Sequence, residues 1–117
     1  MSGRVVHFEI GGRDTAKAAA FYKAAFGCTA SPYLGPALHA HTGKPETISG
    51  FFNALGHEPH NYVTLYIEAD DMAAVLDRTT QAGGAKIVGP MLLPSGQSFA
   101  WIKDPDGNIM ALITPQP

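Results

Sequence analysis

The chain has little cysteine, little charge and no long apolar run. Its 117 residues include one cysteine, Cys28, and 15% charged residues. One cysteine cannot form a disulfide within the chain, and this is typical of proteins from a reducing compartment. No apolar stretch approaches the roughly 20 residues that a membrane-spanning helix needs, and the first residues lack the apolar core of a signal peptide. We therefore expect a cytoplasmic protein that does not enter a membrane.

Positive charge is scarce as well. Eight Lys and Arg stand against ten Asp and Glu, which gives a formal net charge of -2, and the basic residues are scattered along the sequence. Because a phosphate backbone is bound mainly by clustered positive charge, we expect no nucleic-acid partner. The hydrophobic content of 45% is enough for one compact domain, and the length leaves no room for a second independent one.

What the chain does contain is an ordered series of elements. Residues 5–10 alternate polar and apolar side chains, which predicts a strand. An alanine-rich stretch follows, opened by Asp14 and closed by Gly27, and it predicts a helix of about three turns. We expect this helix to bury Phe21 and Phe26. Three short strands, broken near Gly35-Pro36 and Gly43-Lys44-Pro45, are then expected within residues 28–53.

The same series occurs a second time. Residues 56–61 read as a linker, residues 62–68 alternate like a strand, and a helix opens at Asp71 and ends at Gly83-Gly84. Three further strands are expected around residues 86–93, 97–103 and 108–114. With an offset of 57 residues, Asp14 superposes on Asp71 and Gly27 on Gly84.

This repetition predicts an internal duplication of a strand, helix and three-strand unit. We place module one at about 4–55, the linker at about 56–61 and module two at about 62–115, within a single domain of residues 1–117. One helix for every four strands favours an α+β fold rich in antiparallel pairs, since a doubly wound parallel sheet needs a helix between most strands.

Four segments together resemble the glyoxalase, bleomycin-resistance and dioxygenase superfamily, also called the vicinal oxygen chelate superfamily. They are residues 6–10, 20–22, 65–74 and the Asp-Pro-Asp-Gly-Asn turn at 104–108. The resemblance spans almost the whole chain and is strongest to generic glyoxalase-like members. It implies two βαβββ modules that form an eight-stranded, cup-shaped mixed sheet with the helices outside, and a small-molecule ligand in the cup.

Metal-binding members of this superfamily place one ligand near the start of each module and one on the last strand of each. His7 matches the first of these positions. The 57-residue offset gives Thr64 as its counterpart, and the last strands offer Ala111 and Ala54. A threonine hydroxyl is a poor zinc ligand and alanine offers none. We therefore predict no tightly bound metal and no cofactor.

The remaining candidates line the same expected faces. His7 and Glu9 share one face of the first strand and are the candidate acid-base groups. The candidate ligand-binding residues are Thr64, Tyr66, Phe99, Trp101 and Ala111. Packing alone would explain Phe99 and Trp101 equally well.

His39 and His41 form a further pair. On a strand they would share one face and could chelate a metal together with Glu9 or Glu46, whereas in a loop or at a sheet edge they would simply be solvated. We favour the second alternative, in which the histidines are solvated, because two histidines without a fixed third ligand are a weak signal of a metal site.

Two functions follow as hypotheses. In the first, the protein binds a small organic molecule without a metal, as the resistance-protein branch does. In the second, it is a lyase or isomerase related to lactoylglutathione lyase, using His7 and a weak or dimer-shared Ni²⁺, Zn²⁺, Mn²⁺ or Fe²⁺. Exposed sheet edges make a homodimer plausible. A scaffold without chemistry is a third class that no feature of the sequence favours.

Overall fold

The computed structural model describes residues 3–42 and 47–117. Its contacts divide it into two compact units. The N-terminal unit is His7–Thr64, and the C-terminal unit is Leu65–Pro117 together with residues 3–6. Within the described ranges no helix is long and apolar enough to cross a membrane.

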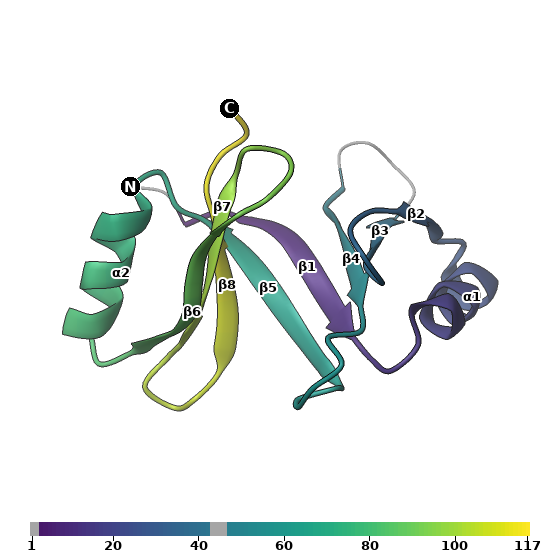
Figure 1. Ribbon diagram of the computed structural model, residues 1–117, viewed down its shortest axis with the longest axis horizontal. Coiled ribbons are helices and arrows are strands. Elements are labelled where there is room, and N and C mark those ends of the chain that lie inside the picture. Colours follow the sequence, from purple (N-terminus) through teal and green to yellow (C-terminus); the bar gives the residue numbers. More distant parts are fainter. Residues whose placement is uncertain (1–2, 43–46) are drawn as a thin grey trace. The chain divides into compact units, whose positions relative to one another are not determined.

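The first series of elements closely follows the sequence pattern (Figure 1). It comprises β1 (Val5–Gly11), α1 (Thr15–Phe26), β2 (Thr29–Pro32), β3 (Leu38–His41) and β4 (Ser49–Asn53). β1 pairs with β4 in parallel, while β3 lies antiparallel to both β2 and β4. The expected chain break at residues 43–45 lies outside the described residues.

The second series repeats this arrangement (Figure 1). It comprises β5 (Tyr62–Glu68), α2 (Met72–Gln81), β6 (Ala85–Leu92), β7 (Ser98–Lys103) and β8 (Ile109–Ile113). β5 pairs with β8 in parallel, and β7 lies antiparallel to β6 and β8. The strand order is β2-β3-β4-β1 in the first series and β5-β8-β7-β6 in the second. The predicted α+β class with two βαβββ repeats is therefore confirmed.

Local capping explains where the helices begin and end. The Asp14 carboxylate accepts hydrogen bonds from the backbone N–H groups of Ala16 (2.9 Å) and Lys17 (3.2 Å), and Gly27 ends α1 in the left-handed conformation at φ 76°. Asp71 caps α2 in the same way through the N–H of Ala74, at 3.1 Å. The caps predicted from the sequence are thus confirmed.

The packing of α1 differs from the prediction. Tyr22 stacks on Phe52 of β4 with 5.2 Å between ring centroids, but Phe21 and Phe26 are 58% and 72% exposed. The predicted burial of these two side chains is wrong. Phe21 and Phe26 lie against the ring of Tyr22, with centroids 5.0 Å and 6.1 Å from it, and Tyr22 is the aromatic residue that reaches the sheet.

The C-terminal unit has a continuous core beneath its helix. Met72 of α2 packs with Ala69, Ala100 and Leu112, all at most 9% exposed. Apolar side chains of the same face surround this cluster, namely Ile67, Val75, Leu76 and Ile102. Burial of this apolar surface is what stabilises the helix on the sheet.

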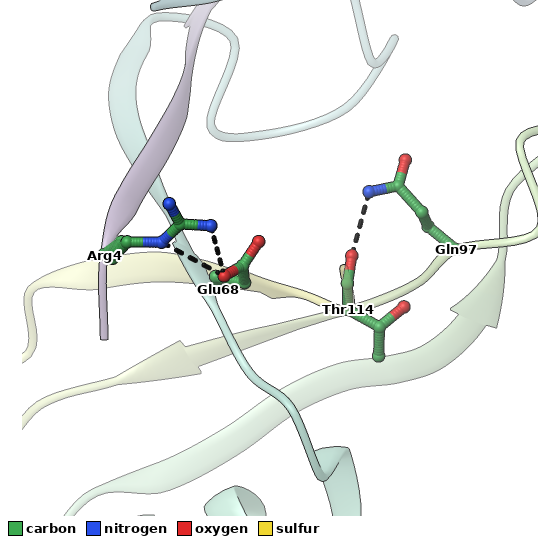
Figure 2. A network of polar contacts seen from close by, with 4 residues as sticks. All are labelled: Arg4, Glu68, Gln97 and Thr114. Atoms are coloured by element: carbon green, nitrogen blue, oxygen red, sulfur yellow. Dashed lines mark hydrogen bonds and ion pairs between the residues drawn. The ribbon is translucent and has the colours of Figure 1, made fainter. Parts of the chain in front are cut away.

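Two polar contacts hold the chain ends of the C-terminal unit, as Figure 2 shows. The Arg4 guanidinium donates to the Glu68 carboxylate at 2.8 Å and fixes the segment before β1 to the end of β5. The buried Gln97 side chain donates to the carbonyl oxygen of Thr114 at 2.8 Å. These contacts secure the ends of the strands that carry the candidate residues.

Candidate functional site

Each unit presents one sheet face to its helix and one face away from it. In the N-terminal unit Phe52 faces α1, and alternation therefore directs Phe51 to the opposite side. The parallel register places Glu9 opposite Phe51 and His7 opposite Ser49. The rings of His7 and Phe51 lie 5.8 Å apart. We call this side, which carries His7, Glu9 and Phe51, the N-terminal helix-free face.

Aromatic and imidazole rings extend this face across β4, β3 and the end of β2. His39 of β3 is the register partner of Phe51, and their ring centroids are 5.2 Å apart. Tyr33 stacks on Phe51 at 5.1 Å and meets His39 edge-on at 4.4 Å. His41 follows at 6.1 Å from His39. Phe51 is 7% exposed and forms the floor of this group, so the partly exposed rings beside it are the accessible ones.

The tautomer of His7 is set by its backbone neighbour. Its Nδ1 lies 2.9 Å from the carbonyl oxygen of Ser49. A carbonyl can only accept a hydrogen bond, so Nδ1 must carry the proton. In the neutral imidazole the lone pair then resides on Nε2. Nε2 is therefore the acceptor nitrogen of this tautomer, the kind of atom that a histidine general base uses.

Glu9 is a buried carboxylate with a phenol partner. It is 3% exposed and accepts a hydrogen bond from the hydroxyl of Tyr62. Gly11 makes this contact possible, since a Cβ at that position would lie 1.9 Å from the Tyr62 ring. Burial and the hydrogen bond to Glu9 both raise the pKa of Tyr62, so the phenol remains a donor over the whole physiological range. The pair meets the need of a buried carboxylate for a hydrogen bond.

Sequence reasoning missed Tyr62 and Phe51. Tyr62 opens β5 on the same side as Thr64, and Thr64 is 3% exposed. A glycine two residues after Glu9 was a visible sign that a bulky side chain crosses β1. Only the structure shows that this side chain is Tyr62.

The predicted residues of the C-terminal unit also gather on one face. Ala100 and Ile102 pack toward α2, so Phe99 and Trp101 face away from it. Trp101 is the register partner of Ala111, which in turn pairs with Tyr66. These three side chains form a row across β7, β8 and β5. We call this side the C-terminal helix-free face.

The last strand of the first repeat has a different register from the one expected. Glu9 and Tyr66 are equivalent at the offset of 57, and their partners on the last strands are Phe51 and Ala111. The counterpart of Ala111 is therefore Phe51 rather than Ala54, which follows the end of β4. Phe51 follows Glu9 by 42 positions, whereas Ala111 follows Tyr66 by 45, so the constant offset fails at the last strand.

Comparison with solved structures defines the class of fold. Streptomyces coelicolor methylmalonyl-CoA epimerase, solved with 2-nitronate-propionyl-CoA, is 15% identical with a TM-score of 0.69 over 97% of this chain and 95% of that one. The Mycobacterium tuberculosis methylmalonyl-CoA epimerase is 15% identical, with a TM-score of 0.68 over 97% and 88%. A hypothetical protein from Bacillus halodurans C-125 is 13% identical, with a TM-score of 0.73 over 100% and 97%. At these identities the similarity concerns the fold.

The family follows from the sequence match. The model of the Glyoxalase/Bleomycin resistance protein/Dioxygenase superfamily matches residues 4–112, and the chain belongs to this superfamily. The resemblance predicted from the sequence is thus confirmed. No curated protein matches the chain.

The residues at the superfamily's metal positions do not fit a metal. With the register corrected they are His7, Phe51, Thr64 and Ala111, which supply one imidazole, one hydroxyl and two apolar groups. Zinc takes about three protein ligands in catalytic sites and about four in structural sites, drawn from imidazole, thiolate and carboxylate groups. Among residues 3–42 and 47–117, no three His, Cys, Asp or Glu are grouped so that they could hold a metal ion.

Proposed function

We propose that the helix-free face of the N-terminal unit binds a small organic molecule without the superfamily's metal. The observation that carries this proposal is the group of rings around Phe51, in which Tyr33, His39 and His7 lie within 5.8 Å of the Phe51 ring beside the buried Glu9. Aromatic surface with a few fixed polar groups is the usual composition of a small-molecule site. The helix-free face of the C-terminal unit is a separate candidate surface with Tyr66, Phe99, Trp101 and Ala111, and the candidate Thr64 belongs to the N-terminal unit.

The proposal is tested by thermal denaturation of chelator-treated protein with three probes. These are bleomycin, S-lactoylglutathione and methylmalonyl-CoA. We expect at least one probe to raise the Tm of the metal-free protein. The rise should be reduced in His7→Ala and His39→Ala, and retained in the matched control His57→Ala in the exposed linker. Absence of any rise, or a rise that requires added Ni²⁺ or Zn²⁺ and disappears in His7→Ala, contradicts metal-free binding.

The tautomer of His7 favours a second candidate function, a lyase or isomerase reaction. The Nε2 lone pair can accept a proton from a carbon next to a carbonyl, and Glu9 is the second candidate acid-base group. This reaction would exchange that proton with solvent. Incubation with methylmalonyl-CoA in D₂O, followed by NMR, should then show deuterium at the α-carbon that His7→Ala fails to introduce. A rate equal to the uncatalysed exchange removes this candidate function.

The cytoplasmic location and the homodimer remain predictions from the sequence.

A further inference from the structure

The histidine pair of β3 stands on a regular strand that is held on both sides. β3 pairs with β2 and with β4, and Ser31 and Thr29 are the β2 partners of His39 and His41. Residues two apart on a strand project from the same face. The two histidines therefore lie on a strand and not in a loop, and His41 is exposed there. They form a fixed pair of imidazoles on the N-terminal helix-free face.

The spacing of the two rings suits one shared metal ion. A metal-imidazole bond of about 2.0–2.1 Å puts the ring centre roughly 3.2 Å from the ion. Two rings on one ion then lie roughly 4.5 Å apart at a right angle and roughly 6.4 Å apart when opposed. The centroids of His39 and His41 are 6.1 Å apart with 24° between the ring planes. The observed separation lies between these two values, so it is compatible with two imidazoles on one ion.

Both side chains are imidazoles, which bind a metal ion through a ring nitrogen. Burial and the neighbouring His41 and His7 lower the pKa of His39, which keeps its lone pair available. The Nε2 of His41 lies 3.2 Å from the hydroxyl of Ser31, a contact that orients the ring and can hold a metal-bound water.

A site with only two protein ligands favours some metal ions over others. In the part of the chain that the structure describes, no third His, Cys, Asp or Glu completes a metal-binding set. Structural zinc sites need about four protein ligands. Cu²⁺ binds imidazole more tightly than the other divalent ions of its row, and it accepts water in its remaining positions.

We propose that His39 and His41 form a two-histidine site for a borderline divalent transition-metal ion, Cu²⁺ foremost, with water as the other ligands. The site is separate from the superfamily's metal positions and does not depend on the proposed ligand-binding function. Its location on β3 places the ion beside the rings of Tyr33 and Phe51.

Calorimetric titration of the full chain with Cu²⁺ and Zn²⁺ tests the proposal. We expect one equivalent of Cu²⁺ to bind, and more tightly than Zn²⁺. Each of His39→Gln and His41→Gln should lose about 100-fold in Cu²⁺ affinity, because the second imidazole binds as an intramolecular ligand. The matched control is the double variant His57→Gln/His60→Gln, which removes the two histidines outside this face and should bind as the unmodified chain does.

A spectroscopic measurement keeps the test valid even where a variant folds poorly. The electron paramagnetic resonance spectrum of the Cu²⁺-loaded, unmodified chain should show coupling to two imidazole nitrogens. Coupling to a single nitrogen, unchanged affinity in either β3 variant, tighter binding of Zn²⁺, or loss of binding in the control variant would overturn the proposal.

Discussion

The two helix-free faces are built on the same arrangement of strands, but they carry different kinds of side chain. All five histidines of the chain fall in the N-terminal unit, and three of them lie on its helix-free face. The C-terminal face has Tyr66, Trp101 and Ala111 in the equivalent rows. Capping aspartates and the parallel pairing of first and last strands are common to both units. The repeated features therefore specify the fold, and the features that differ mark the candidate chemistry.

The helices differ in the same instructive way. α2 buries Met72 in a core cluster, whereas α1 has no buried residue and contacts the sheet mainly through Tyr22. The stability of the N-terminal unit must then depend on side chains of its sheet. Phe52, 1% exposed, is the largest of these.

Replacement of Phe52 should produce the largest loss of stability. Phe52→Ala removes a fully buried ring and leaves a cavity, so we expect a loss of about 4 kcal/mol in the free energy of unfolding. Phe26→Ala, at a 72% exposed position, should cost less than about 1 kcal/mol. Urea denaturation monitored by circular dichroism measures both. Equal losses would show that α1 is packed more tightly than the structure indicates.

The pair of Glu9 and Tyr62 gives the next largest effect. Tyr62→Phe removes the hydroxyl that donates to a buried carboxylate, and we expect a loss of about 2 kcal/mol at neutral pH. Tyr22→Phe is the matched control, since it leaves the ring that stacks on Phe52 in place. Its free energy of unfolding should change by less than about 0.5 kcal/mol. If the two variants were equally stable, the Tyr62 hydroxyl would have no structural role.

The parts of the fold that were predictable are those that depend on neighbours in sequence. Asp14, Gly27 and Asp71 act through backbone groups within five residues of themselves, so the caps could be recognised directly. Alternation within residues 5–10 likewise placed His7 and Glu9 on one face. Helical periodicity was less informative in α1, because its alanines tolerate burial and exposure alike and leave the inward face undefined.

The candidate site depends on strand pairing, and this is why it was only partly predictable. The contact of Glu9 with Tyr62 joins residues 53 positions apart and requires space at Gly11. The position of Phe51 opposite Glu9 follows from the length of the segment before β4, which the repeat does not conserve. His7 and Glu9 could be named from the sequence, but their partners could not. Their catalytic role remains a prediction.

The smallest expected effect is a dependence of the free energy of unfolding on pH. It arises from His39 on the N-terminal helix-free face and has no counterpart on the C-terminal one. Burial and the nearby His41 and His7 lower the pKa of His39, with Glu9 on the same face opposite Phe51. A pKa lower in the folded than in the unfolded chain means that unfolding favours proton uptake. The stability from neutral His39 is then complete above the ordinary histidine pKa of about 6.5 and is lost as the pH falls below it. The urea midpoint should therefore decrease between pH 7.5 and pH 5.5 by a greater amount in the unmodified chain than in His39→Gln.

The control is His57→Gln, which replaces a histidine of the exposed linker and should behave as the unmodified chain does. A decrease of the same size in His39→Gln would assign the acid sensitivity to other groups and remove this difference between the two faces.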